Sequence, residues 1–395
     1  MLRVLTLSLG LLMILANLSV FGEEPTYKGR TAQEWIAALK DKDPSDAAAA
    51  LRRLGPAAIA PLRDALKNDN ARIRSQAAKT LGGFGPKARA ALPALQQALE
   101  DKDHEVRVSA AEALWDIEGQ AEKVLPTLRT ALSDKEARVR SAAAWALLSL
   151  GAAAKSTVPI LRQRLKDEDT DVRVTAAFAL WRIARQAKEA VPVLIEALKD
   201  THYEYRSNVP SMLDQMRPEA DAAIPVYREL LKDRDANLRV SAAGSLGVYG
   251  PKARAAVPAL LDALKDETAL VRQNAVLSLR RIGVAKDMRR TIVPRVHRLL
   301  KDPDTIVRVQ AAGTFWKLTG DTKETLPLLI ETLKTKDGWT LSFTLGVLGE
   351  MKSEAKEALP ALRKKLDMMG PKSSLYQYVL EVMKEIDPQT SPAKK

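Results

Sequence analysis

Residues 99–114 read Leu-Glu-Asp-Lys-Asp-His-Glu-Val-Arg-Val-Ser-Ala-Ala-Glu-Ala-Leu, and closely similar stretches return at residues 132–147 and 165–180. The leucines that open this pattern follow one another at steps of 33 residues, with a single step of 36 before Leu300: Leu66, Leu99, Leu132, Leu165, Leu198, Leu231, Leu264, Leu300, Leu333 and Leu366. A fixed period of this size indicates a solenoid, in which each unit buries its apolar face only against its neighbours.

The composition excludes some classes of site. The chain of 395 residues contains no cysteine, so disulfides, thiolate metal sites and a cysteine nucleophile are all excluded. Its net charge of +13 fits an anionic partner such as nucleic acid, an acidic glycan or a membrane surface. Lysine and arginine alternate with aspartate and glutamate instead of clustering, so a soluble surface explains the charge better.

The chain is organised in three segments. Residues 1–22 have a positive start at Arg3, an apolar run Val4–Phe21 and a small residue at Gly22, which is the pattern of a secretory signal peptide. Residues 23–386 are predicted to be a single solenoid array, and residues 387–395 a disordered tail. We therefore expect an exported protein, periplasmic or secreted, that contacts a membrane only if the signal segment remains uncleaved.

Each unit is predicted to contain two helices. In residues 86–118 the first helix spans about Pro86–Glu100, and it either kinks at Pro93 or starts late after a loose turn. Asp103 is the expected N-cap of the second helix, which runs from about His104 to Glu118 with apolar residues at helical spacing.

The pattern Leu-Lys-Asp-x-Asp-x-x-Val-Arg-x-x-Ala-Ala-x-x-Leu resembles HEAT repeats and, within them, the short HEAT-like repeats of phycobilisome lyases. The resemblance covers about residues 26–386, some eleven units. It implies an all-α fold, a right-handed α-α superhelix in which the second helices line the concave face. The opening Tyr27-Lys28-Gly29-Arg30, followed by Trp35, resembles exported bacterial HEAT-repeat proteins, notably planctomycete ones. Lyase activity is not implied, because no chromophore site can be carried over.

The resemblance also implies a ladder of contacts between units, made by an aspartate and the arginine six residues after it. These pairs are Asp101/Arg107, Asp134/Arg140, Asp167/Arg173, Asp200/Arg206, Asp233/Arg239, Asp266/Arg272 and Asp302/Arg308. The tenth unit has Thr335 and Leu341 instead, so the ladder should end there. We interpret these arginines as structural, because a guanidinium can satisfy a carboxylate and loop carbonyls together.

Residues for catalysis are not found. The three histidines, His104, His202 and His297, occupy different units and different repeat positions, which argues against a metal site. There is no glycine-rich phosphate loop and no Gly-x-Ser-x-Gly elbow. The sequence therefore predicts no catalytic residue, no metal, no cofactor and no enzyme activity.

Departures from the repeat are the candidate binding residues. Counted from the anchoring leucine, positions 10, 13, 16 and 17 should face the groove, because the core takes positions 7, 11 and 15. Position 13 holds Trp145 and Phe178, and position 16 holds Trp115, Leu148, Trp181 and Trp316. Large exposed aromatics are typical of binding hot spots, although packing between adjacent second helices is an equal alternative.

Further along, the same stripe becomes basic at Arg280, Arg281 and Lys317, and Arg182 borders the aromatic zone. We interpret the groove as aromatic in its N-terminal half and cationic in its C-terminal half. The sixth unit is irregular at His202, Tyr203, Tyr205 and Pro210. It is either a contact site or a local change in curvature, with Pro210 kinking the second helix.

The leading hypothesis is a non-enzymatic, exported and monomeric scaffold that binds a protein or peptide on its concave face. One alternative is a polyanion binder for an acidic glycan or nucleic acid, although export opposes a nucleic-acid role. A second alternative is a lyase-like or other enzyme subunit. The sequence identifies neither the partner nor the biological process.

Overall fold

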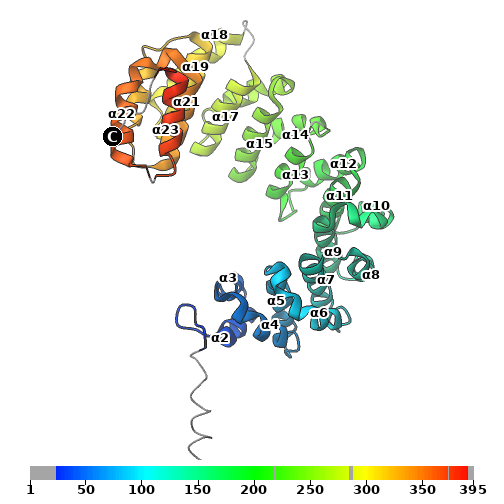
Figure 1. The fold of residues 1–395 in the computed structure, drawn as a ribbon. Helices are drawn as coiled ribbons and strands as arrows, with labels where there is room; N and C mark the ends of the chain where they lie inside the picture. The colour runs from blue at the N-terminus through cyan, green and yellow to red at the C-terminus, as the bar shows by residue number, and fades with distance from the viewer. Residues whose placement is uncertain (1–23, 218, 284–287, 372, 390–395) are drawn as a thin grey trace, which may run out of the picture. The chain divides into compact units, whose positions relative to one another are not determined.

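The computed structural model describes residues 24–217, 219–283, 288–371 and 373–389 (Figure 1). These residues form helices joined by short turns, and the one β-type pairing within them is an isolated bridge between Tyr27 and Arg30. The predicted fold class, an all-α superhelix of two-helix repeats, is confirmed. The predicted signal peptide and most of the predicted tail lie outside the described residues, so both stay predictions.

The chain divides into two compact units, residues 1–193 and 194–395. The first contains α2 (Ala32–Ala37), η1 (Ala38–Lys40), α3 (Ser45–Leu54), η2 (Gly55–Ala58), α4 (Ile59–Ala65), α5 (Ala71–Gly82), η3 (Gly85–Ala91), α6 (Leu92–Ala98), α7 (His104–Glu118), α8 (Ala121–Ala131), α9 (Ala137–Leu150), η4 (Gly151–Thr157), α10 (Val158–Arg164) and α11 (Thr170–Ala184). The boundary falls within α12 (Ala187–Lys199).

The second unit contains η5 (Arg206–Asn208), α13 (Val209–Gln215), η6 (Asp221–Ala223), α14 (Ile224–Leu230), α15 (Ala236–Tyr249), η7 (Gly250–Ala256), α16 (Val257–Ala263), α17 (Ala269–Ile282), α18 (Arg289–Arg298), η9 (Leu299–Lys301), α19 (Thr305–Thr319), α20 (Thr325–Thr332), α21 (Gly338–Met351), η10 (Lys352–Ala358), α22 (Leu359–Met369) and α23 (Tyr376–Ile386). The prediction of one array over residues 23–386 is not tested by this division.

One repeat shows why the two helices of a unit differ. The first helix starts late: a 3₁₀ segment, η3, precedes α6, and Pro93 lies in the first turn of α6. Proline is tolerated there because the first-turn N–H groups have no partner within the helix. The second helix, α7, has the predicted bounds, and the Asp103 carboxylate accepts the Glu105 backbone N–H at 2.9 Å as its N-cap.

Buried apolar side chains, many of them alanines, fill the space between the helices. On α7 the residues at positions 7, 11 and 15, which are Val106, Ala110 and Leu114, are all buried, as predicted. Successive second helices can therefore approach closely, and each unit is stabilised by burying apolar surface against its neighbours.

One described stretch, Ala137–Arg164, is long and apolar enough to cross a membrane by length and composition. Gly151, at φ +52°, divides it into α9, η4 and α10. Its apolar residues include Val139, Leu147 and Leu161, which are fully buried within the unit.

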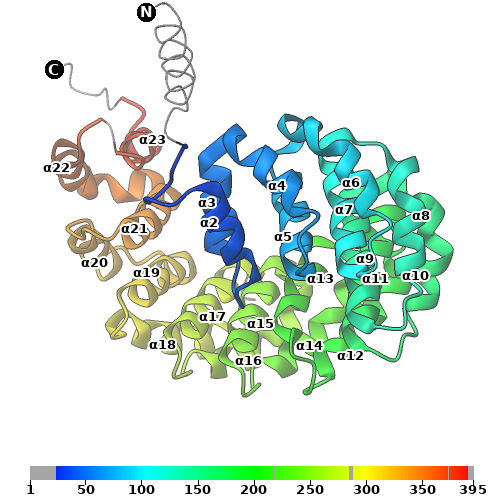
Figure 2. The same ribbon diagram turned by 90° about the horizontal axis from the view of Figure 1, so that it is seen from below.

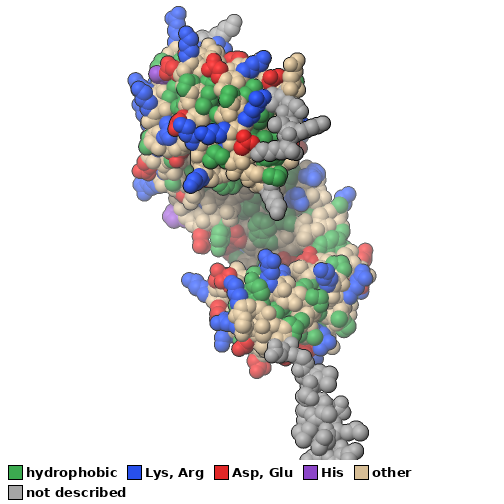
Figure 3. Space-filling model, turned by 60° about the vertical axis from the view of Figure 1, so that its left-hand side comes forward, with side chains coloured by type: hydrophobic (Ala, Val, Ile, Leu, Met, Phe, Trp, Pro, Cys, Tyr) green, Lys and Arg blue, Asp and Glu red, His purple; other side chains and the backbone are tan. Residues whose placement is uncertain are grey.

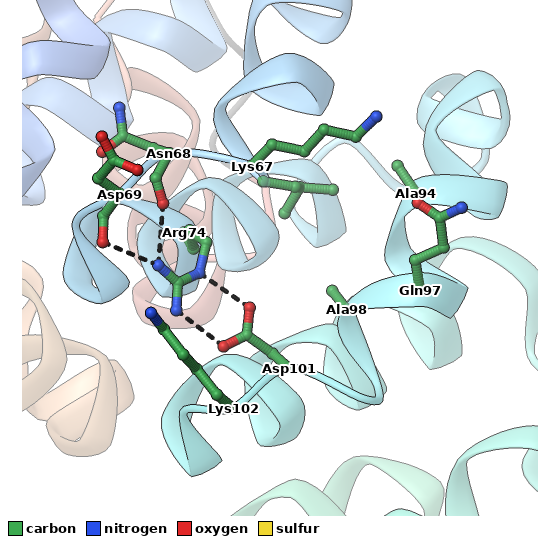
Figure 4. A pocket seen from close by; sticks show the side chains of 10 residues that line it. Lys67, Asn68, Asp69, Arg74, Ala94, Gln97, Ala98, Asp101 and Lys102 are labelled. Atoms are coloured by element: carbon green, nitrogen blue, oxygen red, sulfur yellow. Dashed lines mark hydrogen bonds and ion pairs between the residues drawn. The ribbon is translucent and has the colours of Figure 1, made fainter.

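An arginine ladder joins successive units, but its side-chain pairs differ from the prediction. Arg74 donates through Nε and Nη2 to both carboxylate oxygens of Asp101, each at 2.8 Å (Figure 4). Its Nη1 donates to the backbone carbonyls of Asn68 and Asp69. This guanidinium thus pairs with the aspartate of the next unit, and Asn68, six positions before it, contributes only a carbonyl oxygen.

The same pairing recurs in both compact units, at Arg140–Asp167, Arg206–Asp233, Arg239–Asp266 and Arg272–Asp302. Burial alone would raise the pKa of the Asp167 carboxyl, but the hydrogen bonds from Arg140 and from the Asp169 backbone, together with the charges of Arg140 and Arg164, keep the pKa below its usual range. Thr335 follows in place of the next aspartate and offers Arg308 no carboxylate. These arginines therefore stabilise the stacking of units, as their structural interpretation requires.

Candidate functional site

In the first compact unit, α7, α9 and α11 lie on one side of the helix layers and α8 and α10 on the other (Figures 1 and 2). We call the side formed by α5, α7, α9 and α11 the second-helix face. It carries most of the aromatic residues that the sequence singled out. Trp145, on α9, is 42% exposed there.

Trp145 rests on a backing of other aromatic rings. It contacts Phe178 edge to face, with ring centroids 6.3 Å apart, and Phe178 stacks on Trp181 at 5.6 Å. The guanidinium of Arg185 lies 4.8 Å from the centroid of the Trp181 ring, a cation–π contact. We call Trp145, Phe178, Trp181 and Arg185 the aromatic cluster.

Of the two alternatives for the aromatic stripe, exposure or packing between adjacent second helices, Phe178 and Trp181 follow the second. Their exposed fractions are 7% and 6%, because the two rings stack on each other and Arg185 covers the second. They support Trp145 instead of offering faces of their own. Trp115 and Leu148 are half-buried, and Arg182 is exposed at the side of α11. Whether any of these residues binds a partner stays a prediction.

Two acidic residues of α7 have a raised pKa, and their nearest neighbours in other repeats are on α5: Lys79 for Glu112 and Gly82 for Asp116. Glu112 occupies position 13 of its unit, the position that Trp145 occupies on the neighbouring helix α9. Burial raises the pKa of the Glu112 carboxyl to about 7, and Lys79 on α5 and Asp116 on α7 act on it electrostatically. Burial also raises the pKa of Asp116. We call Glu112 and Asp116 the acidic edge.

The predicted cationic stripe of the second compact unit is partly wrong. The Arg280 side chain is only 8% exposed, because it extends over Gly313, where an added Cβ would lie 2.3 Å from Arg280 Nη1. It donates to the Gln310 side-chain oxygen at 3.1 Å, and Glu350 lies 3.6 Å away. Burial lowers the pKa of Arg280. Arg280 therefore belongs to the packing between α17, α19 and α21.

The other residues of that stripe are not gathered into a basic groove. Arg281 and Lys317 are exposed on different helices. Trp316 is half-buried and donates its indole N–H to Glu354 at 2.8 Å. Lysine and arginine alternate with aspartate and glutamate on the surface in view in Figure 3.

In the sixth repeat the predicted kink is wrong, because the second helix begins late. α13 starts at Val209, so Pro210 lies in its first turn and is buried. Tyr203 and Tyr205 contact each other edge to face at 6.0 Å, and the His202 side chain is 97% exposed. Asp214 links this helix to the next repeat, because its carboxylate accepts a hydrogen bond from the Ser245 hydroxyl at 2.7 Å.

The histidines do not converge within the described residues. His104 lies 3.3 Å from Glu136, and His297 lies 2.7 Å from Glu324. In that part of the chain, no cluster of three or more histidine, aspartate or glutamate residues could hold a metal ion.

Glu112, Asp116 and Arg185 were not among the residues predicted from the repeat pattern. A signal for Glu112 was present, because it stands at the repeat position of Trp145 and is the one acidic residue among positions 79, 112, 145, 178, 211, 244, 277, 313 and 346. For Arg185 no periodic signal exists, since it caps α11 in the left-handed region at φ +55°.

The comparisons with known proteins concern the fold. A family model described as HEAT repeats matches residues 32–115, 92–168, 158–230 and 224–290. No curated protein matches. Among solved structures, the chain is similar to YibA of E. coli, at 22% identity and a TM-score of 0.52, over 73% of this chain and 99% of that one.

The chain is also similar to parts of two other solved structures. Kap95p, in a complex with RanGDP, has 14% identity and a TM-score of 0.50, covering 90% of this chain and 56% of that one. The CpcE–CpcF complex of phycocyanin lyase from Nostoc sp. PCC7120 has 24% identity and a TM-score of 0.39, covering 58% and 94%.

Proposed function

This chain belongs to the HEAT-repeat proteins, and on that premise we propose that it is a non-enzymatic, exported scaffold that binds a protein or peptide through its aromatic cluster. The HEAT solenoid fold supports a scaffold or protein-binding role in general. The observation that carries the specific proposal is Trp145, which is 42% exposed on a rigid backing of buried rings.

The aromatic cluster has the properties of a binding hot spot. Tryptophan dominates hot spots because it buries a large area while losing little side-chain entropy. Trp145 is also held by its edge contact with Phe178, so part of the ordering that binding requires is already present.

A polyanion receives less support as the ligand. Arg280 is buried, and the exposed Arg281 and Lys317 stand on separate helices. Five ladder arginines already pair with aspartates: Arg74, Arg140, Arg206, Arg239 and Arg272. Export rests on the signal pattern of residues 1–22 and is part of the proposal.

Affinity capture by the mature chain, beside Trp145→Ala and Trp339→Ala, tests the proposal. Trp339 is a matched control because it is 73% exposed and lies on α21 in the other compact unit. We expect one partner to bind the wild type and Trp339→Ala and to be lost from Trp145→Ala, while circular dichroism shows all three to be equally helical. Equal capture by Trp145→Ala would contradict the proposal.

A further inference from the structure

The two most exposed large apolar side chains among the described residues lie at one edge of the second compact unit. Trp339 is 73% exposed in the first turn of α21, and Met368 is 72% exposed in the last turn of α22. Each lies beside the turn that joins the two helices of its repeat, so both belong to the same edge of the array. Trp339 is held in place there, because the Asp337 carboxylate caps α21 by accepting the Thr340 backbone N–H at 2.7 Å.

Contacts between the last two repeats join these turns. The Lys365 ammonium, on α22, donates a hydrogen bond to the Thr335 carbonyl, which lies just before α21. A Cβ added at Gly338, the residue before Trp339, would lie 3.8 Å from Leu375 Cδ1. Lys365 and Leu375 stand on either side of the turn that follows α22. The turn before α21 therefore lies against the end of α22 and the turn after it.

The side chains around Trp339 and Met368 are mainly basic. Lys336 lies three residues before Trp339, and Lys364 lies one helical turn before Met368, on the same face of α22. Both lysines are exposed, and within the described residues neither forms an ion pair with a carboxylate. The segments 335–339 and 363–369 contain two carboxylates, Asp337 and Asp367, and four cations: Lys336, Arg363, Lys364 and Lys365. We call Trp339, Met368, Lys336 and Lys364 the C-terminal edge.

An exposed tryptophan beside lysines without counter-ions has the chemistry of a membrane-interface anchor. Tryptophan is enriched at the level of the lipid headgroups, and lysine is attracted to anionic lipids. A protein hot spot differs, because its central ring is packed against a surround, as Trp145 is against Phe178. Within the described residues no aromatic ring contacts Trp339. Trp339 and Met368 are therefore projecting tips, which a bilayer can receive without a pocket of matching shape.

We propose that the C-terminal edge docks this protein on an anionic lipid bilayer. Trp339 and Met368 enter the headgroup region, and Lys336 and Lys364 face the lipid phosphates. Binding then buries apolar area and neutralises charge together, so both terms contribute to the affinity. This contact does not depend on the apolar run at residues 4–21, and it is independent of the proposed protein-binding role of Trp145.

Co-sedimentation with vesicles tests the proposal. The mature chain, which begins at Glu23, is mixed with vesicles of phosphatidylcholine alone or of phosphatidylcholine with about one third phosphatidylglycerol. We expect binding to the anionic vesicles to be at least about tenfold tighter, and this preference to shrink at about 0.5 M NaCl because salt screens the attraction. Trp339→Ala/Met368→Ala and Lys336→Glu/Lys364→Glu should each bind the anionic vesicles about tenfold more weakly than the wild type.

Matched variants separate the C-terminal edge from a general effect of charge or of exposed rings. Trp145→Ala removes an exposed tryptophan of the first compact unit and should bind the vesicles like the wild type. Lys87→Glu/Lys155→Glu makes the same change of charge at two exposed lysines of that unit and should weaken binding by less than about twofold. Circular dichroism checks that all variants are equally helical.

The absence of binding to the anionic vesicles would overturn the proposal, as would undiminished binding by Trp339→Ala/Met368→Ala. Equal losses in the two charge-reversed pairs would also overturn it, because binding would then follow net charge and not this edge. If Trp339→Ala lost a captured protein while no vesicle bound, the edge would be a protein-binding surface instead of a lipid-binding one. The capture experiment with Trp145→Ala tests the proposed function separately, and neither result decides the other.

Discussion

Positions 13 and 16 of the repeat hold Phe178 and Trp181 on α11 but Gly244 and Gly247 on α15. On α11 the two rings stack, and the cluster they form extends to the exposed Trp145 on α9. On α15 a Cβ added at Gly247 would lie 2.3 Å from Ser278 Oγ and 2.9 Å from Ser278 Cα.

The difference shows two uses of one repeat position. Glycine lets the next helix approach until side chains bond its neighbour's backbone, as when the Ser278 hydroxyl donates to the Ala243 carbonyl at 2.6 Å. Aromatic residues instead fill the space between helices with rings whose outermost member is exposed. The α15 position therefore serves packing alone, and the α9–α11 region can also carry a surface for binding.

The largest expected effect on stability comes from the arginine ladder, which both regions contain. Arg140→Ala and Arg272→Ala each leave a buried ladder aspartate, Asp167 or Asp302, without its main partner. Each should lower the free energy of unfolding by about 3 kcal/mol. Urea unfolding followed by circular dichroism measures both. If only one variant lost much of its free energy of unfolding, the ladder would not stabilise both regions equally. The α9–α11 and α15 regions could then not be compared as parts of one common framework.

The second prediction compares the contributions of Phe178 and Trp145 to the stability of the fold. Phe178→Ala removes a buried ring and should destabilise the fold by about 3 kcal/mol, whereas Trp145→Ala removes a half-exposed ring and should destabilise it by about 1 kcal/mol. Thermal unfolding of the two variants gives the difference. Equal losses would mean that Trp145 is a core residue, which would weaken its interpretation as a binding surface.

Replacing the two glycines of α15 should have smaller effects on stability, with opposite signs at the two positions. Gly247→Ala forces its methyl against Ser278 and should destabilise the fold by about 1–3 kcal/mol. Gly244→Ala meets only the Asn274 side-chain amide, at 3.5 Å, and should stabilise it by up to about 1 kcal/mol through helix propensity. Thermal unfolding should give Gly244→Ala the higher melting temperature of the two variants. A higher melting temperature for Gly247→Ala would refute the close-packing explanation.

The smallest expected effect is a pH-dependent gain. Because the folded-state pKa of Glu112 is raised to about 7, its ionisation opposes folding as the pH rises from the unfolded-state value toward 7. Glu112→Gln should therefore be more stable than the wild type by about 1–2 kcal/mol at pH 8, with the gain shrinking toward pH 5. Urea midpoints across this range measure it, and a gain that did not change with pH would contradict the raised pKa.

Much of the architecture could be predicted, because periodicity reports burial directly. The 33-residue spacing predicted the repeat, the helix bounds His104–Glu118 and the N-cap Asp103, all of which the structure contains. Local signals were less decisive where proline was involved. Pro93 allowed either a kink or a late start, and Pro210 was assigned to a helix interior although α13 begins only one residue before it.

The candidate site could be predicted only in part. The register identified the stripe that carries Trp145, Phe178 and Arg280, but it did not say which side chains remain exposed. That depends on neighbours in other units: Trp181 stacks on Phe178, and Gly313 makes room for Arg280. The acidic edge was missed because the effect of burial on the Glu112 carboxyl cannot be read from its place in the sequence.

The sequence by itself determined the all-α repeat and its period, because these follow from an apolar pattern that recurs along the chain, and the family resemblance implied a structural role for the recurring arginines. Only the tertiary structure decided that arginines such as Arg140 pair with the next unit's aspartate, that Phe178 and Arg280 are buried, and that Trp145 stands exposed. The physical reason is that a repeat fixes where a side chain starts, whereas its exposure and charge state depend on the volumes and charges of residues one or two units away.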